Sequence, residues 1–465
     1  MNISDDSKIG NFTLDIGEER RPPLAFLLVV AGLGFLAFFT GTKLVASVGN
    51  NIGPFEVVAM FLFILAFFYF LKNKLKVQFN FTILMLILIV VTAVLSLPNL
   101  ADRIEWGAIQ FLLLVYTTLL VLVMYNVLLQ FPGLIKHLLR FLMLGAFVAG
   151  VWIILEGILS NATIGTAGPF RNRVHAGIYM LTTFWLLLFY FFWPGVSKVE
   201  RIADIFVILV VLYSVAVSGR RSVYLSFFIG LAILAMSFLV IQGRGRFKLS
   251  ISVGFVGAIL LILALIGPDY IPQLGFFYDR IGLIDDRLQL AIGNSDDIEN
   301  SDNFIVLQRE GMIQAVSDHP LLGIGWGAFF ESKYSPTGHE MHSTPQRYLA
   351  ELGIIGFTFY LLFNLYLAFG SLRLFLRVRQ TKYQLPALII MVAIWSLAIS
   401  WAYNRSVTER TYWLLMIVFI SFDTLVSREL AKLPKPTKVT KAQRVNRYPR
   451  PEHSHAPPVL PYSRK

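Results

Sequence analysis

The chain has 465 residues, of which 56% are hydrophobic and 15% are charged, and it carries 40 Lys and Arg residues against 28 Asp and Glu residues. Soluble domains usually contain about 25% charged residues, so this composition argues against a soluble protein and for a polytopic membrane protein. The chain contains no cysteine, which excludes disulfide bonds, cysteine-ligated zinc, iron–sulfur clusters and a cysteine nucleophile.

Twelve apolar segments follow one another along the chain, each of about 17 to 25 residues and therefore long enough to cross roughly 30 Å of hydrocarbon. They are predicted at residues 24–40, 54–71, 81–97, 107–128, 138–158, 174–193, 202–217, 223–241, 249–266, 348–370, 385–401 and 411–427. The first segment is too long for a signal-peptide core and follows a polar stretch that includes Arg20 and Arg21, so it is expected to be a retained membrane anchor. The sequence therefore predicts an all-α multi-pass membrane protein.

The distribution of basic residues orients these spans. The N-terminal segment, the connections after the even-numbered spans and the C-terminal tail hold 27 of the 40 Lys and Arg residues. Because cytoplasmic connections are enriched in Lys and Arg, both termini are predicted to be cytoplasmic. The predicted organisation is a cytoplasmic segment 1–23, nine spans in 24–266, an extracytoplasmic loop 267–347, three spans in 348–427 and a tail 428–465.

The loop 267–347 lies between spans 9 and 10 and is acidic, with twelve Asp and Glu residues against five Lys and Arg residues. A connection of this length in a compact bundle is usually functional. Within it, Phe304 to Ser317 carries apolar residues at helical spacing, and Asp318-His319-Pro320 ends the pattern. We expect an amphipathic helix on the outer mouth of the bundle, with an apolar face formed by Ile305, Met312, Ile313 and Val316.

The tail 428–465 holds ten Lys and Arg residues, two Glu residues and seven prolines. It has little apolar surface to bury, which predicts a disordered extension. We expect it to bind anionic membrane lipids, and nucleic-acid binding is the less favoured alternative.

Four arginines occupy very short outer connections, where the charge rule disfavours them: Arg171, Arg173, Arg220 and Arg221. A guanidinium group at the outer membrane edge suits a diphosphate head group, because it donates in a fork that matches phosphate oxygens. The alternative is that these side chains snorkel and bind carbonyl groups at the end of the seventh span.

The start of the tenth span carries a second group of candidates. Pro345 suits a first helical turn and Ser343 or Thr344 can cap it, so His342 is expected beside the positive end of a helix, where phosphate binds. Glu351 lies one turn inside the membrane edge, where a buried carboxylate is a functional candidate. A local ion pair between Arg347 and Glu351 is the alternative.

The sequence does not favour a metal site or a nucleotide site. Asp285-Asp286, Asp296-Asp297, His339 and His342 form no convincing ligand set, so we predict no metal and no cofactor. The glycine run at 323, 325 and 327 is not followed by the Lys-Ser/Thr pair of a phosphate-binding loop, so it predicts a turn.

Four of these stretches together resemble the bacterial O-antigen ligase and polymerase superfamily. His342-Ser343, nine residues, Gly353, four residues and Thr358 resemble the ligase signature, and Asp318 to Gly327 is similar to the "HPLLGxGxG" stretch of the superfamily. Ser218 to Ser222 resembles its "S-R-G/R" span junction, and Arg309 stands where the family often has an arginine. His175 is a departure, because many relatives have Asn there.

The resemblance implies a metal-independent glycosyltransferase of the bacterial inner (plasma) membrane, acting on the extracytoplasmic face in lipopolysaccharide or polysaccharide biosynthesis. The donor would be a glycan on undecaprenyl diphosphate, and the acceptor a hydroxyl or amide on a lipid A core-like glycolipid or a protein. His342 would then act as general base or orienter, with Glu351 behind it, and the diphosphate would bind Arg171, Arg173, Arg220, Arg221 and Arg309.

Other functions remain open at this level. A polymerase that joins lipid-linked repeats has the same signatures. A flippase for the same lipid would be expected to show repeated halves and charged or broken helices near the midplane, and neither is visible in the sequence. A purely structural scaffold would tolerate substitution of His342 and Arg220.

Overall fold

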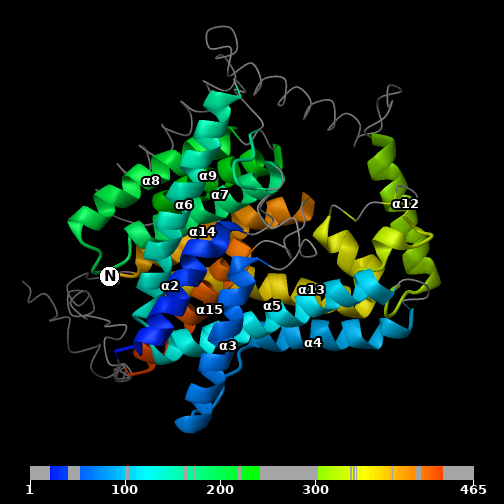
Figure 1. Ribbon diagram of the computed structural model, residues 1–465, viewed down its shortest axis with the longest axis horizontal. Helices are drawn as coiled ribbons and strands as arrows, with labels where there is room; N and C mark the ends of the chain where they lie inside the picture. The colour runs from blue at the N-terminus through cyan, green and yellow to red at the C-terminus, as the bar shows by residue number, and fades with distance from the viewer. Residues whose placement is uncertain are drawn as a thin grey trace, which may run out of the picture.

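The computed structural model describes residues 21–39, 53–99, 104–160, 166–170, 173–217, 221–240, 302–335, 338, 341, 343–379, 381–403 and 410–432. Within these ranges the protein consists of helices, turns and loops, with no β-strand (Figure 1). The prediction of an all-helical protein is confirmed for this part of the chain.

The helices coincide closely with the predicted apolar segments. They are α2 (Leu24–Leu36), α3 (Pro54–Lys72), α4 (Phe81–Leu95), α5 (Ile104–Gln130), α6 (Leu134–Leu159), α7 (Arg173–Phe191), α8 (Lys198–Val217), α9 (Arg221–Val240), α12 (Asp302–Asp318), α13 (Thr344–Arg377), α14 (Gln384–Tyr403) and α15 (Arg410–Ala431), with short 3-10 turns at Ala37–Phe39, Leu97–Asn99 and Phe329–Glu331. The predicted ninth span, 249–266, lies outside the described residues.

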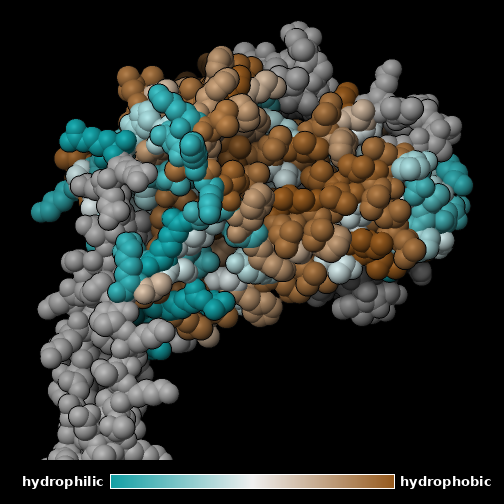
Figure 2. Space-filling model, turned by 90° about the horizontal axis from the view of Figure 1, so that it is seen from below, coloured by the Kyte–Doolittle hydropathy of each residue, from teal (hydrophilic) through white to brown (hydrophobic). Residues whose placement is uncertain are grey.

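Several of these helices can cross a membrane by length and composition. Four are long and apolar enough, namely α3, Gly107–Gln130 within α5, α6 and α13, and five further apolar helices have 10–17 residues. Figure 2 shows a broad hydrophobic surface between two hydrophilic ends, one of them on the side where α12 lies in Figure 1. An apolar surface of this extent is typical of a protein embedded in a bilayer.

The helices form one connected bundle. α13 packs against α4 and α14, α4 packs against α5, and α5 packs against α15. On the other side α2 packs against α6, α6 against α8, α8 against α7, and α14 against both α7 and α9. One hydrophobic core runs through these contacts, so α4, α5 and α13 are held in fixed positions relative to each other.

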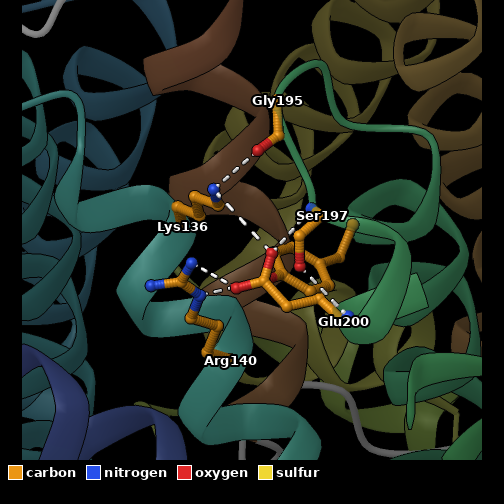
Figure 3. A network of polar contacts seen from close by, with 6 residues as sticks. Lys136, Arg140, Gly195, Ser197 and Glu200 are labelled. Carbon is orange, nitrogen blue, oxygen red and sulfur yellow. Dashed lines mark hydrogen bonds and ion pairs between the residues drawn. The ribbon is translucent and has the colours of Figure 1, made fainter. Parts of the chain in front are cut away.

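Helix ends that the charge rule assigns to the cytoplasmic side contact each other. Lys136 and Arg140, one turn apart on α6, point toward Glu200 at the start of α8 (Figure 3). Ser197 and Glu200 also form a reciprocal capping box, with Ser197 N–H donating to Glu200 Oε2 (2.9 Å) and Glu200 N–H donating to Ser197 Oγ (3.2 Å). Lys136 Nζ donates to the carbonyl oxygen of Gly195 at 2.9 Å. The network ties α6 to the connection that precedes α8.

A helix, α12, lies at the predicted position within the segment 267–347, and its predicted apolar face is partly buried, with Met312 packed against a small hydrophobic core. Its buried positions are Gln308, Gly311 and Ala315, whereas Ile313 is 51% exposed. A Cβ atom at Gly311 would lie 1.8 Å from the carbonyl oxygen of Tyr334. At Gly311 the following segment therefore approaches too closely for any residue with a side chain.

Candidate functional site

The site is built around a break in α13. The helix runs from Thr344 to Arg377, but Gly353 has φ 63° and ψ −167°. A residue in this conformation interrupts the ladder of backbone hydrogen bonds, so carbonyl groups before it and amide groups after it need other partners.

The glycine-rich loop 319–327 supplies those partners. Four hydrogen bonds join the two backbones: Ile324 N–H to Ala350 O (3.0 Å), Gly325 N–H to Glu351 O (3.0 Å), Ile354 N–H to Pro320 O (2.9 Å) and Ile355 N–H to Leu321 O (3.3 Å). The glycine-rich loop and the broken region of α13 are thus bound to each other, although they are separate in the sequence.

Two glycines make this contact possible. A Cβ atom at Gly323 would lie 2.4 Å from the carbonyl carbon of Glu351, and one at Gly353 would lie 2.4 Å from the carbonyl group of Leu321. Both residues also have positive φ, of 68° and 63°. The predicted turn in the glycine run is confirmed, and Gly323 within it allows the loop backbone to pack directly on the backbone of α13.

Glu351 and Arg347 form a buried ion pair. Arg347 Nε donates to Glu351 Oε2 at 2.9 Å, and the two side chains are only 3% and 4% exposed. The backbone N–H of Gly327 donates to the same oxygen at 2.8 Å. The local pair considered from the sequence is therefore present, and Glu351 also binds the glycine-rich loop.

The loop and α13 are further attached to α5 and to the end of α4. Arg347 Nη2 donates to Gln110 Oε1 (3.3 Å), and Trp326 Nε1 donates to the Gln110 carbonyl oxygen (3.1 Å). The Arg347 guanidinium carbon lies 4.5 Å from the centre of the Trp326 ring, in a cation–π arrangement. Asn99 Nδ2 donates to the carbonyl oxygen of Gly323 at 2.8 Å. We refer to Gln110, Trp326, Gly327, Arg347 and Glu351 as the Arg347 cluster.

A small hydrophobic core separate from the main one joins α12, the segment that follows it and the start of α13. It contains Ala315, Ile324, Phe329, Tyr334, Met341 and Ala350. Met341, which directly precedes His342, is 1% exposed. Ser343, which directly follows, occupies the N-cap position of α13 without a side-chain capping bond, and its carbonyl oxygen accepts the Arg347 N–H at 3.0 Å. Both neighbours of His342 are therefore anchored.

Most of the predicted diphosphate-binding residues lie outside the described part of the chain. His342, Arg171 and Arg220 are not described, nor are the side chains of Arg173 and Arg221, which open α7 and α9. Arg309 is exposed on α12, and His175 is partly exposed on α7. The acidic pairs weighed as metal ligands also lie outside; the described residues contain no group of three His, Cys, Asp or Glu side chains that could hold a metal.

A second buried ion pair was missed by the sequence analysis. Arg410 Nε, at the start of α15, donates to Glu56 Oε1 at 2.5 Å, and these side chains are 4% and 7% exposed. Glu56 Oε2 accepts the Gly53 N–H at 2.8 Å at the start of α3. Arg410 precedes a predicted span on the outer side, so the charge rule that singled out Arg171 and Arg220 could have found it.

An apolar groove of about 760 Å³ runs along the carboxyl-terminal half of α6. Its lining consists of Val148, Val151, Trp152, Leu155, Glu156, Leu159, Ser160 and Gly168. Gly168 belongs to the segment 166–170 that leads toward Arg171 and Arg173.

Comparison with models of known protein families gives no match, and comparison with curated proteins gives none either.

Proposed function

We propose that the protein is a membrane glycosyltransferase that moves a glycan from undecaprenyl diphosphate to an acceptor hydroxyl or amide on the extracytoplasmic face. The observation that supports this most is the docking of the loop 319–327 on the break at Gly353. These stretches carry the resemblance to O-antigen ligases, and their contact gives the resemblance a physical reason.

In this proposal His342 is the general base or orienter for the attacking acceptor. Imidazole titrates near neutral pH and can take the proton that the acceptor loses as it attacks the anomeric carbon. The residues on either side of His342, namely Met341 and Ser343, are anchored in the structure, which supports this role. Glu351 acts through Arg347 and the glycine-rich loop, since its Oε2 atom already accepts two hydrogen bonds.

The donor is proposed to bind by its charged head and its apolar tail. Arg171, Arg173, Arg220, Arg221 and Arg309 would neutralise the diphosphate and stabilise the charge that develops as it departs. The groove on α6 suits part of a polyprenyl chain, because its lining is mostly apolar and it adjoins the segment before Arg171.

The proposal includes twelve spans with both termini in the cytoplasm and the loop 267–347 outside. The contacts at helix ends support this arrangement. Lys136 and Arg140 meet Glu200, and Arg428 meets Gln78, at ends assigned to the cytoplasm. Glu56 meets Arg410, and Gln110 meets Arg347, at ends assigned to the outside.

Transfer by the purified protein in nanodiscs tests the proposal. A defined lipid-linked glycan and candidate acceptors are supplied with a chelator present, and products are identified by mass spectrometry. His342→Ala is expected to lower turnover by about 10² to 10⁴ while membrane insertion stays normal. Turnover restored only by a divalent ion would contradict the metal-independent mechanism, and an unaffected His342→Ala variant would remove His342 from the reaction.

The products of this assay, together with a lipid-scrambling assay in liposomes, separate the rival functions. A longer glycan that stays on the lipid carrier indicates a repeat polymerase. Movement of the lipid across a liposome without bond formation indicates a flippase and contradicts the transferase proposal.

A further inference from the structure

We infer that Arg347 and Gln110 are positioning residues for the glycan transfer, an inference that rests on the proposed function. Neither residue needs to touch the substrate. Their role is to set the position of the start of α13, and with it His342, relative to the glycine-rich loop and α5.

The first step of the argument is where Arg347 lies. It is five residues after His342, and its backbone N–H donates to the carbonyl oxygen of Ser343 at 3.0 Å. Any shift of the Arg347 backbone therefore shifts the residue that follows His342. The residue is 2% exposed, so its guanidinium group depends on protein partners to offset the loss of hydration.

The second step is what those partners connect. Glu351 belongs to α13, Trp326 to the loop, and Gln110 to α5. A planar guanidinium that satisfies a carboxylate, an amide oxygen and an aromatic ring together permits few arrangements of the three elements. Glu351 extends the connection to the loop through the Gly327 N–H at 2.8 Å.

The third step is the sensitivity of catalysis to position. A displacement of about 1 Å of a reacting group can cost roughly 10²-fold in rate. Loosening the Arg347 cluster is thus expected to lower kcat through a misplaced His342. Donor binding depends on other arginines, so KM for the donor should change little.

The chain contains a matched control for a purely structural role. The Glu56–Arg410 pair is also a buried arginine–carboxylate pair assigned to the outer side, but it joins α3 to α15. Replacing Glu56 by Gln removes a comparable interaction without altering the partners of Arg347.

The experiment compares Arg347→Gln, Arg347→Lys, Gln110→Ala and Glu56→Gln in nanodiscs, with turnover expressed per folded molecule. Arg347→Gln is expected to lower kcat by about 10- to 100-fold with a KM for the donor within about twofold of wild type. Arg347→Lys should recover part of kcat, because it keeps the charge beside Glu351 but loses the planar contacts. Gln110→Ala should lower kcat less, and Glu56→Gln should keep kcat even where its melting temperature falls.

Hydrogen exchange gives a readout that does not depend on transfer. Arg347→Gln should increase exchange at Ile324, Gly325 and Gly327, whose amides bind α13, whereas Glu56→Gln should not. If wild type transfers glycan and Arg347→Gln and Glu56→Gln have equal kcat, the inference is overturned while the proposed function stands. If wild type transfers nothing, the proposed function fails. In that case unchanged hydrogen exchange in Arg347→Gln would also overturn the positioning role of Arg347. Increased exchange in this variant would support that role.

Discussion

Asp204 is a carboxylic acid on the buried face of α8. It has no exposed surface, and neither of its carboxyl oxygens has a hydrogen-bond partner in the described part of the chain. Val207 and Val211 continue the buried face of the helix. A buried carboxyl without partners must either lose its hydration as an anion or take up a proton, and both cost free energy.

Replacing this carboxyl by a neutral side chain should therefore stabilise the protein. Asp204→Asn is expected to raise the free energy of unfolding by about 1 kcal/mol, measured by thermal unfolding in detergent at neutral pH. Asp423→Asn is the control, because Asp423 Oδ1 lies 4.0 Å from Arg377 Nη1. Removing the charge of this paired carboxylate should not stabilise the protein. A clear loss of stability in Asp204→Asn would contradict an unpartnered acid at this position.

Gly353→Ala should disrupt the contact between the glycine-rich loop and α13. The new alanine would have to adopt φ 63°, which is unfavourable for a residue with a side chain. Its Cβ atom would lie 2.4 Å from the carbonyl group of Leu321. The expected loss is roughly 2–4 kcal/mol in the free energy of unfolding, or local release of the loop seen as faster proteolysis there.

Gly338→Ala separates the two causes of this loss. Gly338 has a similar φ of 59°, but among the residues that the structure describes no atom lies within 4 Å of its added Cβ. If both variants lose the same stability, backbone strain alone accounts for the effect and the close contact with Leu321 is unimportant.

At the scale of elements, a hydrogen bond and an ion pair join the end of α12 to the segment that follows it. Tyr334 Oη donates to Asp318 Oδ2 at 2.6 Å, and Lys333 Nζ lies 3.5 Å from the same oxygen. The hydrogen bond from Tyr334 and the charge of Lys333 lower the pKa of Asp318 below its usual 3.8. Because the pKa of Asp318 is lower in the folded state than in the unfolded state, these interactions stabilise the folded state above about pH 4. Their contribution is lost as the pH falls through the pKa that Asp318 has in the folded state.

Tyr334→Phe keeps the buried ring and removes the hydroxyl donor. The variant should be cleaved faster than wild type in the outer loop at pH 7, and the difference should shrink as the pH is lowered below about 4. Limited proteolysis followed by mass spectrometry measures this. If wild type and Tyr334→Phe are cleaved equally at pH 7, the hydrogen bond does not hold the segment. The same conclusion follows if the difference between their cleavage rates increases as the pH is lowered.

At the scale of the whole molecule, the absence of cysteine allows a direct test of orientation. Lys198 and Ser317 are both exposed, and they lie on α8 and α12 at ends assigned to opposite sides. Ser317→Cys should react with a membrane-impermeant maleimide in sealed right-side-out vesicles, whereas Lys198→Cys should react only after the vesicles are opened. The reverse pattern would place the Arg347 cluster on the cytoplasmic side and contradict the proposed reaction.

The sequence by itself determined where the helices lie, because the length and hydropathy of a segment are local properties. The predicted segment 54–71 corresponds to α3, and Pro345 lies in the first turn of α13 as expected. The glycine run was likewise recognisable as a turn. For the site, the sequence offered the pairing of Arg347 with Glu351 as one of two alternatives, since residues four apart on a helix lie close together wherever that helix packs.

Only the tertiary structure decided which distant groups meet. Gln110 binds Arg347 across 237 residues, and Glu56 binds Arg410 across 354. No local pattern predicts such partners, because they depend on how whole helices pack. The close packing of α12 at Gly311 could not be predicted for the same reason, since it depends on the position of the backbone at Tyr334. Local patterns thus decide which helices form, and the packing of the bundle decides which polar groups must be paired inside it.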